Sequence, residues 1–441
     1  MLIGCPHATG PPAPIGRVSE KISKLFEFRG PARWVEDSPD MPDPTAIQRL
    51  LDTLPGDPFP DFIARFEHTP GTKVVFGEGA VKRTGIFARN LRSQRPMVVT
   101  DRGIADAGHL DHVLASLSAA GVEWSAFMGV EENPTTDTVD ACVAAARAHQ
   151  ADLLIGLGGG SSMDTAKGCN FILTNGGRMS DYHGTGKAVK PMLPMIAIPT
   201  TAGTGSECQS YALISDSVTH AKMACGDKKA AARIAILDPE LTITQPARVT
   251  RVTGIDAIAH ALESAVSKKR TAVSIAYSRA AFGLLSRNYL KVLRDPDDRE
   301  ARAAMLLGAA FAGTAIENSM LGAGHSAANP LTMHFGIVHG EAVGLMLPHV
   351  MRHNLTEPDV WEEYTQLAAP LGLPGEALPE WLTGILEEAG LPRTVRAGLI
   401  TPGLLPVLAQ EAAGQWTAQF NPAPINADDF SRIYNAVGLP D

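Results

Sequence analysis

Residues 153–162 read LLIGLGGGSS, a run of aliphatic residues that ends in glycines and two serines. The aliphatic part is apolar throughout, which is typical of a strand buried on both faces of a sheet. Three successive glycines let the backbone approach a ligand without Cβ atoms in the way. A helix that follows from about Met163 would present free backbone N–H groups to an anion. This stretch therefore predicts a strand, a glycine-rich turn and a helix that can bind a pyrophosphate.

The start of that helix carries its own signals. Ser161 is placed to cap the helix, with Asp164 three residues on as its capping-box partner. However, the pattern Gly156-x-Gly158-x-x-Ser161 lacks the last glycine of the dinucleotide-binding fingerprint, and no acid ends a strand about 20 residues later. The candidate acid, Asp101, follows an earlier strand. A tight strand-to-helix turn without a ligand therefore stays open as an alternative.

The sequence around this stretch alternates between short β-rich runs and amphipathic runs. Such alternation predicts a Rossmann-like parallel sheet covered by helices, with ligands at the carboxyl ends of the strands. After residue 244 the strand signals stop, and alanine and leucine recur at helical spacing. We therefore predict an α/β domain at 66–243 and an all-helical domain at 244–441, with a site between them. The expected strands are 73–76, 97–100, 153–156 and 195–198, and the expected helices include 137–150, 250–268, 272–293, 299–314 and 341–353.

The first 65 residues differ from the rest. Eleven of the 32 prolines fall there, and the apolar periodicity is weak. We interpret residues 1–65 as an extension with one short helix near residues 45–54, and a disordered tail remains the alternative.

Composition limits the classes of function. The net charge of -9 argues against a nucleic-acid partner, because a phosphate backbone selects a surplus of Lys and Arg. The five cysteines form no CxxC pair, which fits a cytoplasmic protein and offers no thiolate metal site. No apolar run reaches the ~18 residues of a membrane span, so we expect no membrane association.

A second loop, residues 199–207 with the sequence PTTAGTGSE, follows the expected strand at 195–198. It combines small residues with four hydroxyls, so it can line a cofactor and hydrogen-bond to it. A capped helix start is the alternative interpretation, since Ser and Thr favour N-caps. Two such loops at strand ends favour a ligand for both.

Carboxylate and imidazole groups recur in the helical half. Asp256 and His260 are four residues apart on an expected helix, so their side chains lie on one face, one turn apart. Three imidazoles and one carboxylate would suit Fe²⁺, Zn²⁺ or a similar ion. Spacing alone does not say which histidines bind. Five of the 13 histidines lie in a later segment: His325, His334, His339, His349 and His353.

Taken together, these motifs resemble the iron-containing (group III) alcohol dehydrogenase family, clearly over residues 66–353. The resemblance implies the dehydroquinate synthase-like fold of that family, an NAD cofactor rather than NADP, and a homodimer. The matched stretches are 76–80, 133–135, 158–164, 199–207, 237–241, 254–260 and 347–352. The metal ligands that it implies are Asp256, His260, His325 and His339. The cofactor-binding residues are Asp101, Gly158, Gly159, Gly160, Ser161, Asp164, Thr200, Thr201, Gly205 and Lys222.

One position departs from the family pattern. Many relatives carry a second histidine four residues after the first C-terminal ligand, where this chain has Asn329. An amide does not titrate, so a proton relay would need water, the cofactor ribose or another side chain. We expect Gln209, Tyr211 and Asn329 to line the substrate pocket, although Gln209 and Tyr211 could equally be ordinary strand residues.

The predicted activity is hydride transfer between NAD(H) and a small alcohol, aldehyde or ketone, with a divalent cation as Lewis acid. Four alternatives stay open. They are a reductase of a specialised anionic aldehyde, a metal-free enzyme of the maleylacetate reductase type, a dehydroquinate synthase and an inactive cofactor-binding protein.

Overall fold

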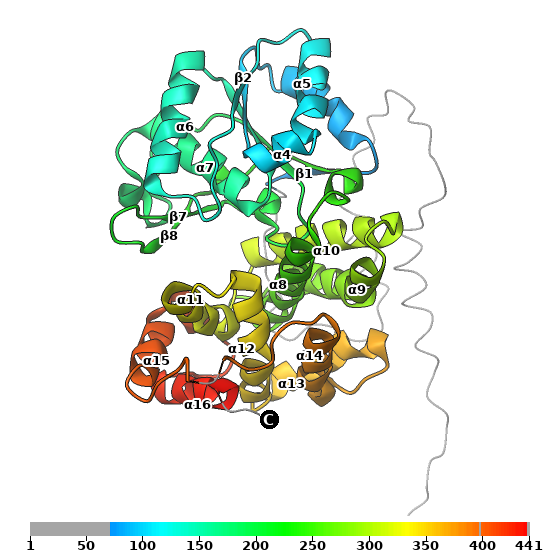
Figure 1. The fold of residues 1–441 in the computed structure, drawn as a ribbon, viewed down its shortest axis with the longest axis vertical. Helices are drawn as coiled ribbons and strands as arrows, with labels where there is room; N and C mark the ends of the chain where they lie inside the picture. The colour runs from blue at the N-terminus through cyan, green and yellow to red at the C-terminus, as the bar shows by residue number, and fades with distance from the viewer. Residues whose placement is uncertain (1–70, 397, 439–441) are drawn as a thin grey trace, which may run out of the picture. The chain divides into compact units, whose positions relative to one another are not determined.

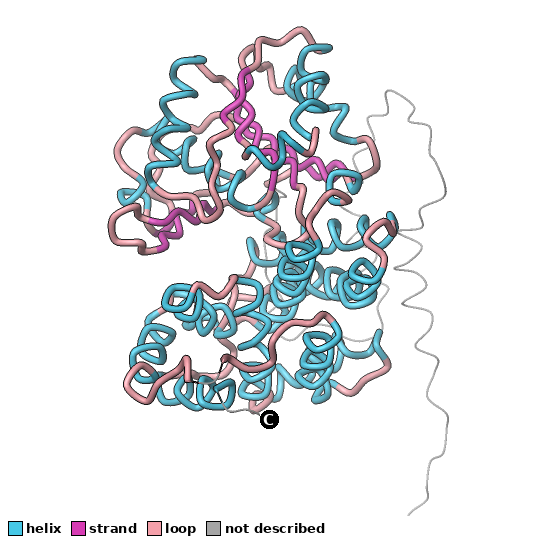
Figure 2. Tube along the Cα trace, in the orientation of Figure 1, coloured by secondary structure: helices cyan, strands magenta, loops and turns pink. Residues whose placement is uncertain are grey.

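The computed structural model describes residues 71–396 and 398–438 (Figure 1). The predicted extension, residues 1–65, and its short helix at 45–54 lie outside the described residues. Among the described residues, strands alternate with helices up to Leu237. From Pro239 onward there are helices and no strands. Figure 2 shows this division as magenta strands in one region and cyan helices alone in the other. The predicted fold class, an α/β region with a parallel sheet and then an all-helical region, is confirmed.

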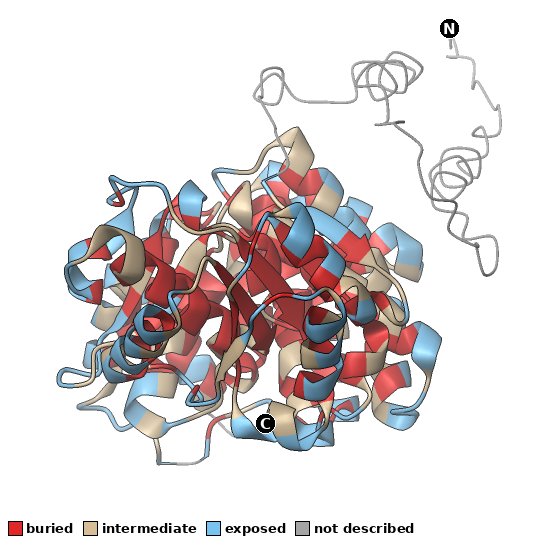
Figure 3. Cartoon of the chain, turned by 90° about the horizontal axis from the view of Figure 1, so that it is seen from above, coloured by how far each residue is buried: buried red, intermediate tan, exposed pale blue. Residues whose placement is uncertain are grey.

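The main sheet has six strands, all parallel, in the order β1-β9-β6-β4-β2-β3. Its neighbouring residues face opposite sides: Val98 packs with the core around α3 and α5, whereas Met97 and Val99 pack with that around α6 and α7. Figure 3 shows the strands as a buried layer among the helices. Burial on both faces explains why 153–157 is apolar at every position. The strands are β1 (Lys73–Phe76), β2 (Pro96–Val99), β3 (Ser125–Phe127), β4 (Leu153–Gly158), β6 (Met195–Pro199) and β9 (Ile234–Leu237).

A small second sheet, in the order β5-β8-β7, lies beside the main one. The sequence did not predict its strands, nor β3 and β9. Strand β5 is only two residues long, and the apolar run of β7 at 211–214 is so short that it does not by itself distinguish a strand from a buried helix segment. The small sheet comprises β5 (Gly184–Thr185), β7 (Tyr211–Ser215) and β8 (Lys222–Gly226). The helices of this half are α3 (Thr84–Asn90), α4 (Arg102–Asp106), α5 (His109–Ala119), α6 (Thr136–His149) and α7 (Gly160–Asn175).

Helix α8 (Ala247–Val266) is the core of the helical region, because every residue from Gly254 to Val266 is buried. Small residues allow its neighbours to pack closely: a Cβ on Gly254 would lie 2.6 Å from the Tyr289 ring. The other helices are α9 (Ala272–Arg294), α10 (Arg299–Glu317), α11 (Ala323–Phe335), α12 (His339–Asn354), α13 (Pro358–Ala368), α14 (Leu378–Glu388), α15 (Leu405–Gly414) and α16 (Ala427–Gly438).

Three ionisable residues of α8, namely Asp256, His260 and Glu263, lie inside this buried stretch. Polar groups in such a position need partners, because their desolvation is costly. The fold therefore directs attention to this turn of α8. No helix in the described part of the chain has the length and apolar character to cross a membrane.

Candidate active site and metal centre

The glycine loop joins β4 to α7 with its backbone exposed to a cavity. Gly158 has a φ of +141°, and a Cβ there would lie 2.5 Å from the Ser162 Oγ. Helix α7 begins at Gly160, and its N-cap, Gly159, makes no side-chain cap. The free N–H groups of this first turn are therefore available to an anion.

This corrects the predicted start of the helix. We expected the helix from about Met163, capped by Ser161 with Asp164 as the capping-box partner. Instead, Ser161 lies inside the first turn. The Asp164 carboxylate accepts hydrogen bonds from the Ser206 hydroxyl at 2.7 Å and the Leu213 N–H at 3.3 Å. Two glycines start the helix without a side-chain cap, so rules based on Ser and Thr place its start too late.

Asp101 lies two residues after the end of β2, which pairs with β4 in the sheet. One of its carboxylate oxygens accepts a hydrogen bond from the Ile104 N–H at 3.0 Å and so caps α4. Because β2 and β4 are neighbours in the sheet, Asp101 lies beside the glycine loop although it comes earlier in the sequence. The unusual order of motifs in the sequence is a consequence of this sheet topology.

The loop at 199–207 packs against the glycine loop and against the helical region. The Thr200 N–H donates to the Gly158 carbonyl at 2.9 Å. Gly205 has a φ of +61°, and a Cβ there would lie 2.6 Å from the Gly313 Cα in α10. Gly205 therefore allows two backbones to approach closely, and it does not line the cavity.

A buried lysine forms hydrogen bonds with this loop. Lys167 of α7 is fully buried, and its ammonium donates to the Ser206 carbonyl and hydroxyl, each at 2.7 Å, and to the Tyr211 carbonyl at 2.9 Å. Burial raises the pKa of the neighbouring Glu207 carboxyl to about 7, although Lys167 opposes this. The lysine thus connects α7, the loop and β7 as one polar unit.

The four predicted metal ligands converge in the helical region. The Asp256 Oδ1 atom lies 3.5 Å from the Nε2 atoms of His260 and His325, and 4.0 Å from that of His339. His260 is one turn further along α8, whereas His325 and His339 come from the first turns of α11 and α12. Ligand atoms of Asp256, His260 and His325 all lie within 4.8 Å of one another.

Two atoms of this cluster fit a cation. The Asp256 Oδ1 and the His325 Nε2 are buried and have no hydrogen-bond partner. Leaving such atoms unpaired is unfavourable, and a shared cation would satisfy both. One carboxylate and three imidazoles also form a donor set that Fe²⁺ and Zn²⁺ accept. The residues present therefore fit the metal that the sequence implied.

A further carboxylate, Glu263, fixes the orientation of His325. It accepts a short hydrogen bond from the His325 Nδ1 and another from the Gly324 N–H at 2.7 Å. The His325 Nε2 is thereby directed at Asp256. Sequence reasoning missed Glu263, although its spacing of three from His260 and seven from Asp256 places it on the same face of the helix.

The charges of the cluster are strongly coupled. Burial opposes ionisation of Asp256, but the three neighbouring imidazoles hold its pKa well below its usual value. Burial would lower the pKa of His325, but the carboxylates of Glu263 and Asp256 raise it to about 9. Burial lowers the pKa of His339 to about 3. A cation would replace the proton that this carboxylate pair favours on His325.

The three predicted substrate-pocket residues lie around the same cavity. The Gln209 side-chain amide donates to the Thr204 carbonyl at 2.7 Å. Tyr211 begins β7, and its ring stacks on Trp416 with centroids 5.9 Å apart. Asn329 donates from its amide to the Gln415 Oε1 at 3.1 Å. The C-terminal segment thus completes this part of the wall, which no sequence motif indicated.

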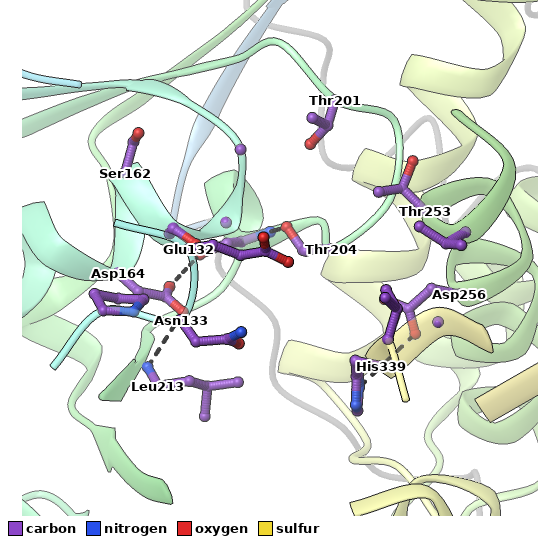
Figure 4. Close-up of a pocket in the computed structure, with 18 of the residues that line it drawn as sticks. Glu132, Asn133, Ser162, Asp164, Thr201, Thr204, Leu213, Thr253, Asp256 and His339 are labelled. Atoms are coloured by element: carbon purple, nitrogen blue, oxygen red, sulfur yellow. Dashed lines mark hydrogen bonds and ion pairs between the residues drawn. The ribbon is translucent and has the colours of Figure 1, made fainter. Parts of the chain in front are cut away.

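One cavity of about 1520 Å³ collects most of these groups. Ligand sites for drug-sized molecules are roughly 300–1,000 Å³, so this volume accommodates a dinucleotide and a small substrate. Figure 4 shows Ser162 and Asp164 on one side of the cavity, and Asp256 and His339 on the other. Of the predicted site residues, only Gly158 and Gly205 do not line it. Those that do are Asp101, Gly159, Gly160, Ser161, Asp164, Thr200, Thr201, Gln209, Tyr211, Lys222, Asp256, His260, His325, Asn329 and His339.

Lys222 extends from β8 into this cavity. Its surroundings lower the pKa of its ammonium mainly by desolvation, while the carboxylates of Asp164 and Asp256 raise it. The lysine is thus in the electrostatic field of both halves of the site, between the glycine-loop helix and the histidine cluster.

Fold and site together combine a glycine-rich loop in the α/β half with a cluster of one carboxylate and three imidazoles in the helical half. Residues 71–239 match the family model for iron-containing alcohol dehydrogenases, and residues 250–438 match the model for the C-terminal part of that family. The chain belongs to the iron-containing alcohol dehydrogenase family.

Relatives of the chain act on different small molecules. It is 33% identical over 368 residues to the NAD-dependent methanol dehydrogenase of Bacillus methanolicus, covering 81% of this chain and 96% of that protein. The crystal structure of a 1,3-propanediol oxidoreductase matches with a TM-score of 0.81 at 29% identity, covering 85% of this chain and all of that one. Sulfoacetaldehyde reductase from Bifidobacterium kashiwanohense, solved with NAD⁺, matches with a TM-score of 0.79 at 26% identity, covering 86% of this chain and all of that one.

Proposed function

We propose that this protein is a metal-dependent oxidoreductase that transfers hydride between NAD(H) and a small alcohol, aldehyde or ketone. One observation carries the proposal: the buried Asp-His cluster and the glycine loop line a single cavity. Membership in an alcohol dehydrogenase family supports the reaction class. The named relatives, which include an NAD-dependent methanol dehydrogenase, support the cofactor.

In this proposal, Asp256, His260, His325 and His339 hold one divalent cation, with Fe²⁺ preferred and Zn²⁺ as the alternative. When bound, the cation supplies Lewis acidity toward an alcohol or carbonyl oxygen. Glu263 keeps the His325 ring in the orientation that binding requires. Asp256, His260 and His325 are buried, which limits the access of bulk water to their ligand atoms, whereas His339 is partly exposed.

The α/β half would bind the cofactor. The first turn of α7 offers its N–H groups to the pyrophosphate. Asp101 would accept hydrogen bonds from the adenosine ribose hydroxyls and repel a 2′-phosphate, which favours NAD over NADP. Thr200, Thr201 and Lys222 would surround the nicotinamide ribose, since they line the cavity between the glycine loop and the metal cluster.

The substrate end of the cavity is closed by fixed, uncharged side chains. Tyr211 stacks on Trp416, and Asn329 is held by Gln415. Asn329 cannot exchange a proton, so the proton that accompanies hydride transfer would leave through water, the cofactor ribose or another side chain. These uncharged side chains favour a small uncharged substrate over an anionic one. Lys222 is the cationic group that would pair with the substrate if the protein were instead a reductase of an anionic aldehyde.

A spectroscopic screen tests the proposal. The protein is stripped with a chelator, reloaded with Fe²⁺ or Zn²⁺, and assayed at 340 nm with NAD(H) over alcohols and aldehydes. We expect activity that requires both the metal and NAD(H). Full activity in the chelated protein would favour a metal-free reductase of the maleylacetate type. Absence of activity and of bound metal under all loadings would refute the proposal.

A further inference from the structure

A second, separate cavity of about 330 Å³ lies at the N-terminal end of α8. It lies between that helix turn, the end of α9 and the first turn of α10. Its polar lining includes Thr250, Arg251, Arg294, Arg302 and Glu388. Nothing in the proposed activity uses these residues.

The charge of this lining is unbalanced. Three of the lining residues are arginines and one is a glutamate. The Arg294 guanidinium already pairs with the Glu388 carboxylate at 2.6 Å. Within residues 71–396 and 398–438, no carboxylate lies at ion-pair distance from Arg251 or Arg302. The nearest acidic influence on Arg302 is Asp297, which acts on it from beyond ion-pair distance. The lining of this cavity therefore carries an excess of positive charge.

Arg302 is the more deeply buried of the two, with 3% of its surface exposed. Its Nε donates to the Pro296 carbonyl at 2.8 Å, and its Nη1 donates to the Thr250 hydroxyl at 3.2 Å. These bonds use two of the five N–H groups of a guanidinium. Burying a charged group without an opposite charge at ion-pair distance is costly, so the position favours an anionic partner.

Arg251 adds an independent signal. Its Nε is buried and has no hydrogen-bond partner, which is rare for such a strong donor. Arg251 follows Thr250 on α8, so its neighbour in the chain is the hydroxyl that accepts from Arg302. Arg251 and Arg302 also line the same small cavity.

The start of α8 favours the same kind of ligand. The helix is 20 residues long and begins at Ala247, which lines this cavity. Its N-cap, Pro246, makes no side-chain cap, so the first turn has free N–H groups and a positive helix end. This end lies beside both cavities, since Pro246, Arg248 and Val249 line the large one.

We propose that this cavity binds a small oxyanion, a phosphate or carboxylate group, between Arg251 and Arg302. Guanidinium forks match the paired oxygens of both anions. The volume is near the lower end of the roughly 300–1,000 Å³ range of ligand pockets, which suits a single small anion.

The site adjoins the large cavity through Gln245, which lines both. The Gln245 amide donates to the Thr253 hydroxyl at 3.1 Å, one turn of α8 before Asp256. A bound anion would thus lie next to the helix turn that leads to the metal cluster.

Calorimetry with inorganic phosphate, at ionic strength held constant with NaCl, tests this proposal without any activity assay. Wild-type protein is compared with Arg251→Met and with the control Arg352→Met, which removes an exposed arginine paired with Glu380. The glycine loop is unchanged in all three proteins, so binding there is common to each. We expect the saturable phosphate site to persist in the control and to weaken by about 10–100-fold in Arg251→Met.

A second variant and a second ligand extend this experiment. Arg302→Met should lose the same site, and if that protein does not fold, Arg251→Met alone decides. Succinate titrated in place of phosphate shows whether a carboxylate or a phosphate is the better occupant. Identical phosphate isotherms for Arg251→Met and Arg352→Met would overturn the proposal.

Discussion

The two halves of the large cavity differ in the groups that they offer to a ligand: backbone groups in one half and side chains in the other. The glycine loop offers backbone N–H groups, and its function depends on the absence of side chains at Gly158 and Gly160. The cluster around Asp256 offers side-chain atoms from three helices, fixed by burial and by Glu263. We therefore expect substitutions that add atoms to disturb the glycine loop, and substitutions that remove side-chain atoms to disturb the cluster around Asp256.

This difference predicts how each half fails. Loss of one side chain from the cluster removes a ligand and leaves the others buried without a partner. Loss of a side chain near the loop has smaller effects, because the N–H groups remain. Adding a methyl group at Gly158 or Gly160 should displace the side chain of Ser162 or Thr204, and at Gly158 it would also strain a backbone with a φ of +141°.

The largest effect is expected for His260→Ala. It removes one of the four proposed ligands, so we expect bound metal to fall well below one ion per chain and kcat/KM to fall on the order of 10³-fold. Metal analysis and the assay at 340 nm measure the two quantities. His334→Ala is the control, because His334 pairs with Glu411 and does not line the cavity. Unchanged metal content in His260→Ala would remove His260 from the ligand set.

Gly205→Ala tests the close backbone approach beside the cavity. The residue has a φ of +61°, and its Cβ would lie 2.6 Å from the Gly313 Cα. We expect a loss of about 2–4 kcal/mol in the free energy of unfolding, measured by urea denaturation. The control is Gly283→Ala in α9, where nothing lies within 4 Å of the added Cβ. Equal stability of the two variants would mean that the loop and α10 can separate freely.

Glu263→Gln keeps the volume of the side chain and removes its charge. The His325 ring would lose the carboxylate that orients it, so we expect metal affinity to fall about 10–100-fold with the fold intact. Competition with a chelator of known affinity measures this. Glu362→Gln, an exposed change on α13, should leave affinity unaltered. Wild-type affinity in Glu263→Gln would show that the orientation of His325 does not depend on this carboxylate.

The smallest effect is expected at Asp101, on the backbone-dominated half. Asp101→Ser removes the charge but retains an oxygen that can cap α4. We expect the ratio of kcat/KM for NAD to that for NADP to fall roughly tenfold, since repulsion of the 2′-phosphate is lost. Asp106→Ser, on the same helix and outside the cavity lining, is the control. An unchanged ratio in Asp101→Ser would assign cofactor choice elsewhere.

The sequence predicted the parts of this molecule that local patterns encode. The apolar run at 153–157 gave a buried strand, and the four-residue spacing placed Asp256 and His260 on one helix face. It did not select His325 and His339 among five histidines, because spacing along the chain says little about which helices meet. The family resemblance made that selection, and the structure brings both residues to Asp256.

Other features depend on contacts between distant segments. Trp416 and Gln415 join the substrate end only because the C-terminal helices fold back on α11. Lys167 follows Asp164 by three residues, a common surface pattern, yet here it is fully buried under the 199–207 loop. The start of α7 was placed too late because its cap is a glycine.

The central claim is that the Asp256 cluster holds a cation inside the cofactor cavity. Anomalous diffraction from crystals loaded with Fe²⁺ and NAD⁺ tests it most directly. We predict one anomalous peak at about 2.0–2.2 Å from Asp256 and the three imidazoles, as is usual for such ligands. A cluster that stays empty after loading, or a peak bound elsewhere, would contradict the account.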